Sequence, residues 1–302
     1  MQAVTAYWMR FTPRTRSILW NLLSGVLFSV MSTLVKYTGQ QLPSIEVVFG
    51  RSIFGLLFIF PFILYFGPKQ VFVTDRWKLQ LVRCLIGTLA MTCTFYSLAK
   101  LPMVDVTAIN FSKPIYILLI AAIFLRERVR PIQFILTIIG FIGILVILRP
   151  APETFDANYL IAVFAAVLVA FAITIVKELT DSETPFSVLA WFSLLSTAIS
   201  LPLAIYFWQE PTPRQWIELV STGFVGIIAQ FCVIRSYALA PASYLAPLGY
   251  INIFYTGFFG FMVFGHVPDA PSIIGAVIIM GSTFYLMRKG GKRREIVEDQ
   301  TN

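Results

Sequence analysis

Basic side chains inside apolar stretches are the residues of this 302-residue sequence best placed to do chemistry. Lys113 is the deepest of them, about ten residues into an apolar run, which corresponds to roughly 15 Å along a helix. An ionisable group at that depth of a bilayer costs a few kcal/mol, and a lysine can snorkel only about half that distance. We therefore expect Lys113 to face a water-filled cavity and to contact a solute there. Pro114, the next residue, loosens the backbone at the same depth.

Three arginines and a glutamate also lie inside apolar runs. Arg51 is about two turns into its run, and two interpretations stay open for it: a salt bridge to another helix, or contact with a solute. Arg83 and Arg235 each lie within about two turns of the end of a run, so we expect both side chains to snorkel to the surface. Glu46 is near the start of its run, where the helix dipole stabilises an acid.

Uncharged polar residues supply the remaining candidate contacts to a solute. Asn110 and Tyr116 each lie three residues from Lys113, which places them on one face of a helix with it. Further candidates in other apolar runs are Tyr96, Gln230, Tyr250 and Asn252. Each of these alone is more often a contact between helices than a contact with a ligand.

An interior lined by bases and poor in acids favours a solute with a carboxylate or another anionic group, and repels a purely cationic solute. We therefore predict that the solute is a small zwitterionic or carboxylate-bearing metabolite and that Lys113→Ala abolishes its transport. The scarcity of acids leaves no carboxylate relay for protons.

A protein that catalyses a reaction inside the membrane is a weaker alternative to one that transports a solute. His266 is the only histidine, and the sequence has no metal-ligand cluster, no HExxH or GxSxG motif and no paired carboxylates. We expect no catalytic residue, no metal and no cofactor. A channel is the third class, but the sequence has no selectivity-filter motif.

The composition indicates that this protein is surrounded by lipid and not by water. Hydrophobic residues make up 58% of the chain and charged residues 13%, against roughly 45–50% and 25% in soluble proteins. A water-soluble fold could not cover so much apolar surface with charge. The composition therefore indicates an all-α polytopic membrane protein and excludes disordered, collagen-like, disulfide-rich and DNA-binding proteins. The net charge of +8 is spread over short clusters between apolar runs, which is typical of topology signals.

A membrane-spanning helix needs about 20 mostly apolar residues, and ten runs qualify. They are Ser17–Val35, Ser44–Phe66, Leu79–Ala99, Met103–Leu125, Ile132–Leu148, Ala157–Val176, Pro185–Trp208, Trp216–Ala240, Ser243–Gly265 and Pro271–Met287. With both termini in the cytoplasm, the cytoplasmic segments hold 15 Lys and Arg and the opposite side holds 4. This bias satisfies the positive-inside rule. We therefore expect cytoplasmic tails at residues 1–16 and 289–302.

The two halves of the sequence repeat with a shift of about 140 residues. The matching positions are Val35-Lys36 with Val176-Lys177, Pro43 with Pro185, Pro61 with Pro202, Tyr96-Ser97-Leu98-Ala99 with Tyr237-Ala238-Leu239-Ala240, Pro102 with Pro241, and Arg149 with Arg288. Five helices are an odd number, so the second copy enters the membrane inverted, which is the architecture of alternating-access carriers. We expect five-helix repeats at 17–149 and 157–288. The alternative is coincidence, since prolines favour helix ends anyway.

Several short motifs occur in order along the ten runs. They are Leu34-Val35-Lys36, Glu46-Val47-Val48-Phe49-Gly50-Arg51-Ser52, Tyr96-Ser97-Leu98-Ala99-Lys100-Leu101-Pro102, Lys113-Pro114 followed by Glu127, and the stretch from Tyr237 to Tyr250. With these motifs the chain resembles the drug/metabolite transporter superfamily, specifically its EamA-type carriers. The family usually ends its fourth and ninth helices with an acidic signature. Glu127 keeps that signature, whereas Phe264-Gly265-His266 replaces it.

The resemblance implies a ten-helix inner-membrane carrier of small organic solutes, with helices 1, 3, 4, 6, 8 and 9 around a central cavity. It favours export of an amino-acid-like or opine-like solute. Import of a vitamin, a nucleoside or an S-adenosylmethionine-like compound is the alternative. We expect the partners to be the solute and membrane lipid, without nucleic acid, and the carrier to act as a monomer or a homodimer.

Overall fold

A computed structural model describes residues 11–101, 103–127, 129–148, 157–251, 255, 270–271, 273–282 and 284–285. None of these residues lies in a β-strand, so the described chain is all-helical. The helices are α2 (Pro13–Gly39), α3 (Ser44–Phe66), α4 (Pro68–Phe72), α5 (Trp77–Lys100), α6 (Met103–Asn110), α7 (Lys113–Phe124), α8 (Pro131–Leu148), α9 (Asn158–Thr180), α10 (Pro185–Tyr206), α11 (Pro213–Leu239), α12 (Ala242–Leu245) and the 3-10 helix η1 (Ala246–Ile251).

Threonine–proline pairs begin three of the long helices. Thr12, Thr184 and Thr212 each cap a helix whose first residue is proline, and each hydroxyl accepts a hydrogen bond from a backbone N–H of the first turn. Proline suits the first position because its missing N–H would have no partner there. Gln215 completes a capping box, since its side chain accepts from the N–H of Thr212 at 2.7 Å.

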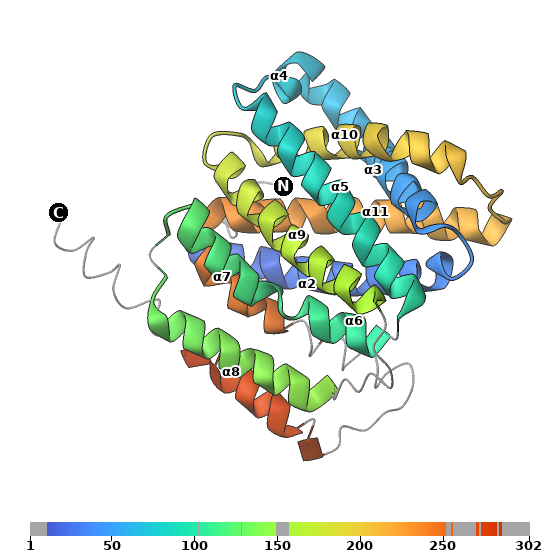
Figure 1. The fold of residues 1–302 in the computed structure, drawn as a ribbon. Helices are drawn as coiled ribbons and strands as arrows, with labels where there is room; N and C mark the ends of the chain where they lie inside the picture. The colour runs from blue at the N-terminus through green and yellow to red at the C-terminus, as the bar shows by residue number, and fades with distance from the viewer. Residues whose placement is uncertain are drawn as a thin grey trace.

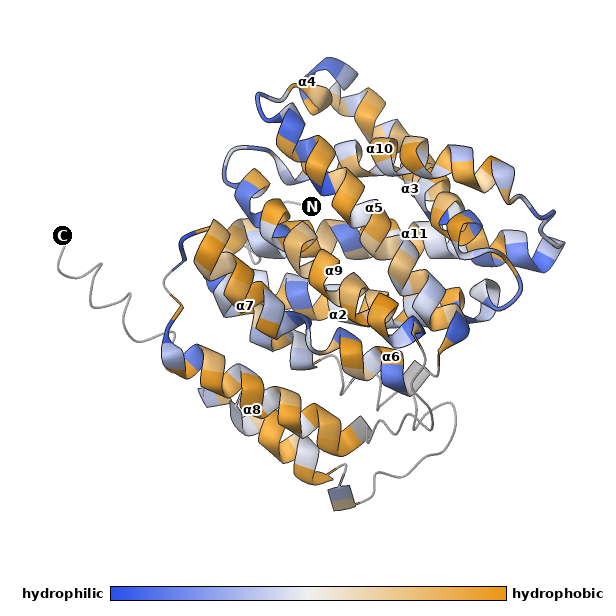
Figure 2. Cartoon of the chain, viewed as in Figure 1, coloured by the Kyte–Doolittle hydropathy of each residue, from blue (hydrophilic) through white to orange (hydrophobic). Residues whose placement is uncertain are grey.

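Among the described residues, seven helices are long and apolar enough to cross a membrane. They are Pro13–Gly39, Ser44–Phe66, Trp77–Lys100, Asp105–Phe124, Asn158–Thr180, Pro185–Tyr206 and Pro213–Leu239. Each coincides with one of the ten predicted runs, and α8 coincides with an eighth. Apolar residues follow the helices and hydrophilic ones gather at their ends (Figure 2). The side chains of Ile123 and Phe284 are 71% and 66% exposed, as lipid contact requires. Most of the ninth predicted run, with Asn252, and part of the tenth lie outside the described residues, as does His266.

The fourth predicted run is a candidate span, Asp105–Phe124, but its helix is interrupted at the centre. Helix α6 ends at Asn110 and α7 begins at Lys113, with a turn at Phe111 and Ser112 between them. Pro114 explains the break, because its ring would clash with the carbonyl of Asn110 and it has no N–H to continue the ladder.

Helices from the two halves of the sequence pack side by side. The most extensive pairings join α2 to α11 and α5 to α9, and α3 packs against α10 (Figure 1). Apart from these, α8 lies along the last described helix at one edge of the molecule (Figure 1). There Gly143 and Gly275 are in backbone contact: a Cβ on Gly275 would lie 2.5 Å from the carbonyl oxygen of Gly143.

Candidate functional site

Arg51 of α3 lies where five helices meet. Its Nη1 donates to the Sδ of Met91 on α5 at 3.0 Å, and its Nη2 donates to the carbonyl of Gly226 on α11 at 3.4 Å. Its Cζ is 5.6 Å from the centre of the Phe192 ring on α10. Met31 of α2 lies beside Gly226 as well, because its Sδ would be 3.1 Å from a Cβ added to that glycine. The guanidinium is therefore at the junction between the two halves of the chain.

The burial of Arg51 leaves its charge without a balancing acid. The residue is 6% exposed, and its Nε has no hydrogen-bond partner. Among the ion pairs of the described residues none involves Arg51. The interpretation as a salt bridge between helices thus finds no partner in this part of the chain, and contact with a solute remains a prediction.

Arg83 of α5 is the second buried arginine, and the prediction that it snorkels to the surface is wrong. It is 2% exposed, and its Cζ stacks 3.6 Å from the centre of the Phe192 ring. Its Nε and Nη1 have no hydrogen-bond partner. Arg235, in contrast, is exposed, with its Cζ 5.8 Å from the ring of Phe231 on its own helix, and its snorkelling remains a prediction.

The sequence interpretation also missed Gln80. This residue is fully buried on α5, and neither its amide nitrogen nor its amide oxygen has a partner. The buried Oγ of Ser187 on α10 has none either. The sequence did contain a signal for Gln80: Gln80, Arg83 and Gly87 occupy one helix face at offsets of three and four residues.

Lys113 is the first residue of α7, directly after the break in the helix. It is half-buried, and the described residues offer its ammonium neither a hydrogen bond nor an ion pair. The N-terminal end of a helix is itself positive, so the site attracts anions. Tyr116 follows Lys113 by one turn of α7, so these two share a helix face. Asn110 ends α6 on the other side of the break, so its place on the same face remains a prediction.

The other candidates are dispersed. Gln230 lies one turn beyond Gly226 on α11, on the side that faces Arg51, and Tyr96 is half-buried on α5. Tyr250 of η1 is 1% exposed and donates from its hydroxyl to the carbonyl of Thr137 on α8 at 3.0 Å, which is a packing contact between helices. The solute contacts of these residues remain predictions.

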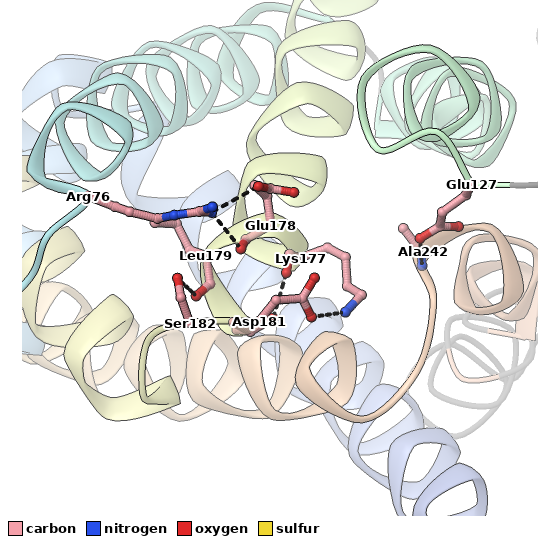
Figure 3. Close-up of polar contacts among 9 residues, drawn as sticks. Arg76, Glu127, Lys177, Glu178, Leu179, Asp181, Ser182 and Ala242 are labelled. Carbon is pink, nitrogen blue, oxygen red and sulfur yellow. Dashed lines mark hydrogen bonds and ion pairs between the residues drawn. The ribbon is translucent and has the colours of Figure 1, made fainter.

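Two glutamates bind backbone N–H groups of the other half of the chain. Glu127, which follows α7, accepts from the N–H groups of Ala242 and Ser243 at 3.0 and 2.9 Å and so caps α12 (Figure 3). Glu46 is 1% exposed, and its Oε2 accepts from the N–H of Gln209 at 3.1 Å. Glu127, the acid that follows the fourth predicted run, therefore joins the two halves of the chain.

Side chains also join the halves near the start of α5 and the end of α9. Arg76 pairs with Glu178 at 2.8 Å (Figure 3), and the hydroxyl of Thr74 donates to Glu183 at 2.5 Å. Arg76 and Glu178 also line a cavity of about 670 Å³ between α5, α7 and α9. Neither this cavity nor a smaller one of about 200 Å³ beside Glu46 is lined by Arg51, Arg83 or Lys113.

Within the described ranges, no three His, Cys, Asp or Glu side chains are grouped so that they could hold a metal ion. The chemistry that the described polar groups offer is the binding of anions and hydrogen-bond acceptors by buried donors.

The chain is similar to known transporters over most of its length. The model of the EamA-like transporter family matches residues 15–149 and again residues 157–288. The S-adenosylmethionine uptake transporter of Rickettsia bellii (strain RML369-C) is 31% identical over 268 residues, which cover 89% of this chain and 92% of that protein.

Two further relatives carry different names. The riboflavin transporter of Vibrio cholerae is 28% identical and covers 89% of this chain and 91% of its own. The pseudopaline exporter CntI of Pseudomonas aeruginosa is 28% identical and covers 90% and 95%. A solved crystal structure has the same fold, with a TM-score of 0.76 at 19% identity over 93% of this chain and 99% of the other.

Proposed function

This chain belongs to the EamA-like transporter family, and from that premise we propose that it is a secondary carrier of a small, carboxylate-bearing zwitterion. It is a member of the drug/metabolite transporter superfamily, and the part of the chain that the structure describes holds seven apolar helices of spanning length, so it is a multi-pass membrane transporter. The finer proposal is a carrier of the inner membrane, with ten helices and both termini in the cytoplasm. The charge bias between the predicted loops supports this orientation.

Alternating access between two inverted repeats is the proposed mechanism. The family model matches the chain twice, which supports the repeat. The pairing of helices is also reciprocal: the first helix of the first half, α2, packs on the third of the second half, α11, and α9 packs on α5 in the same relation. A twofold axis in the membrane plane would exchange these two pairs, as it does in carriers that rock around a central site.

The observation that carries the substrate class is the burial of Arg51 at the junction of the halves without an acid beside it. A buried charge is costly unless a partner compensates it, and a carboxylate binds a guanidinium strongly. S-adenosylmethionine, named for the relatives at about 31% identity, is an amino acid with such a carboxylate. Relatives are named for uptake and for export, so export by this chain stays a prediction.

Lys113 and the break before it form the second part of the proposed site. The positive end of α7 and the ammonium point to the same class of solute as Arg51. Asn110, Tyr116 and Gln230 are proposed as polar contacts near these two bases. Tyr96, Tyr250 and Asn252 complete the proposed set, with Tyr250 acting through its contact with α8.

Counterflow in proteoliposomes tests this function. We expect saturable uptake of labelled S-adenosylmethionine that rises when the vesicles are preloaded with unlabelled compound, because a carrier exchanges solute across the membrane. Lys113→Ala and Arg51→Gln should each abolish counterflow, whereas Arg235→Gln, which changes an exposed arginine, should leave it unchanged.

Normal counterflow in correctly inserted Lys113→Ala and Arg51→Gln proteins would refute the proposed site. Flux that is linear in concentration and indifferent to preloading would indicate a channel instead of a carrier.

A further inference from the structure

We propose that Arg83 and Gln80 form a second anion-binding subsite beside the ring of Phe192. The preferred solute then carries two acidic groups, one held by Arg51 and one by Arg83. The inference rests on the proposed carrier function and deepens it from a carboxylate-bearing solute to a dicarboxylate.

The first argument is the number of buried donors without partners. Arg83 is 2% exposed and lacks partners for two nitrogens, and Gln80 is fully buried and lacks them for both amide atoms. An unpaired buried polar group is destabilising, and a charged one more so. A ligand that accepts hydrogen bonds would satisfy the nitrogens of Arg83 and the amide nitrogen of Gln80, and an N–H of the same ligand would satisfy the amide oxygen.

The second argument is the packing of α5 against α10. The Sγ of Cys84 is 3.7 Å from the carbonyl oxygen of Trp191, which sets the register of the two helices. Gln80 is one turn before Cys84, and Ser187 is one turn before Trp191, so both lie at the same level. The Oγ of Ser187 is also buried without a partner. The hydroxyl of Thr88 on α5 also donates to Ser196 on α10 at 3.3 Å, so the two helices run parallel and their unpartnered groups lie at one level.

The third argument is charge. The ring of Phe192 lies 3.6 Å from the Cζ of Arg83 and 5.6 Å from the Cζ of Arg51, so the two guanidinium carbons are within about 9 Å of each other. Two like charges this close in a buried environment repel each other. No ion pair of the described residues includes either arginine. One small molecule with two carboxylates spans this distance and compensates both charges.

Binding of a matched pair of ligands tests the second subsite. The probes are alanopine, an iminodicarboxylate, and its mono-amide, which has one carboxylate fewer at nearly the same size. Affinity for the purified full-length protein is read from ligand-dependent thermal stabilisation. We expect the wild-type protein to bind alanopine at least tenfold more tightly than the mono-amide.

The variants should separate the two subsites. Arg83→Gln should abolish the difference between the two ligands while it retains binding of the mono-amide, and Arg51→Gln should weaken both. Gln80→Leu replaces a buried amide by an apolar side chain of similar volume, so it keeps the fold, and it should weaken the binding of alanopine alone. Arg235→Gln should match the wild-type protein.

Equal affinity of the wild-type protein for the two ligands, or a tenfold preference that survives in Arg83→Gln and Gln80→Leu, would overturn the second subsite. So would failure to bind either probe in a protein with normal counterflow of S-adenosylmethionine. These results would leave the proposed carrier function intact. Absence of counterflow together with absence of binding would instead refute the carrier function, and the second subsite with it.

Discussion

The position of the Arg51 guanidinium depends on the missing side chain of Gly226. A Cβ at residue 226 would lie 2.9 Å from the Nε of Arg51 and 3.1 Å from the Sδ of Met31. Both atoms belong to flexible side chains, which can move by a few tenths of an ångström. We expect Gly226→Ala to raise KM for counterflow several-fold, because the added methyl group displaces the guanidinium of Arg51. Tm should change little, because the fold tolerates the methyl group.

Gly281→Ala is the matched control for this variant, since nothing lies within 4 Å of a Cβ at that position. It should leave both KM and Tm unchanged. A Gly226→Ala protein with a wild-type KM would show that the solute does not contact Arg51.

Depth along a helix is readable from the sequence, but the direction of a side chain is not. The distance of Arg83 from the end of its run allowed its side chain to reach the surface, yet the side chain turns inward to Phe192. That choice depends on the rotation of α5 about its axis. In a membrane, lipid-facing and protein-facing sides are both apolar, so hydropathy does not report the rotation. The unpartnered amide of Gln80 was missed for the same reason.

At the scale of the element, the contact between α8 and the helix at Ile273–Ser282 depends on two glycines. A Cβ on Gly275 would lie 2.5 Å from the carbonyl oxygen of Gly143 and 2.5 Å from the Cγ1 of Ile147. Backbone cannot yield as a flexible side chain does, so we expect Gly275→Ala to destabilise the protein by about 1–3 kcal/mol.

Thermal unfolding in detergent measures this loss as a lower Tm. Gly281→Ala, on the same helix, again serves as the control and should keep the wild-type Tm. Equal Tm values for the two variants would mean that the two helices are not in backbone contact.

The extent of the helices was largely predictable, whereas the break at Phe111 and Ser112 was not. The thickness of the bilayer dictates about 20 apolar residues per span, so runs such as Ser44–Phe66 coincide with the helix that forms. Pro114 was visible in the sequence, but a proline inside a spanning helix is often accommodated without a break, as Pro61 is within α3. Hydropathy alone does not distinguish the two outcomes.

At the scale of the whole molecule, transport by rocking requires the two halves to separate at one end. The hydroxyl of Thr74 and the carboxylate of Glu183 are in hydrogen-bond contact across the halves. In a variant without the native cysteines, oxidation of Thr74→Cys/Glu183→Cys together with a short dithiol should bridge the two cysteines and arrest counterflow, and reduction should restore it.

A second cysteine pair controls for the chemistry of oxidation. Lys177 and Asp181 lie four residues apart on α9, so a disulfide in Lys177→Cys/Asp181→Cys links consecutive turns of one helix and does not join the halves. Counterflow should survive in this variant. Continued counterflow in the fully oxidised 74/183 variant would exclude separation of the halves at this end.

The two arginines against Phe192 have a consequence for the passage of ions. Two buried positive charges repel protons and sodium ions that approach along the interior. We therefore expect proteoliposomes that contain the protein to hold an imposed proton or sodium gradient when no solute is present.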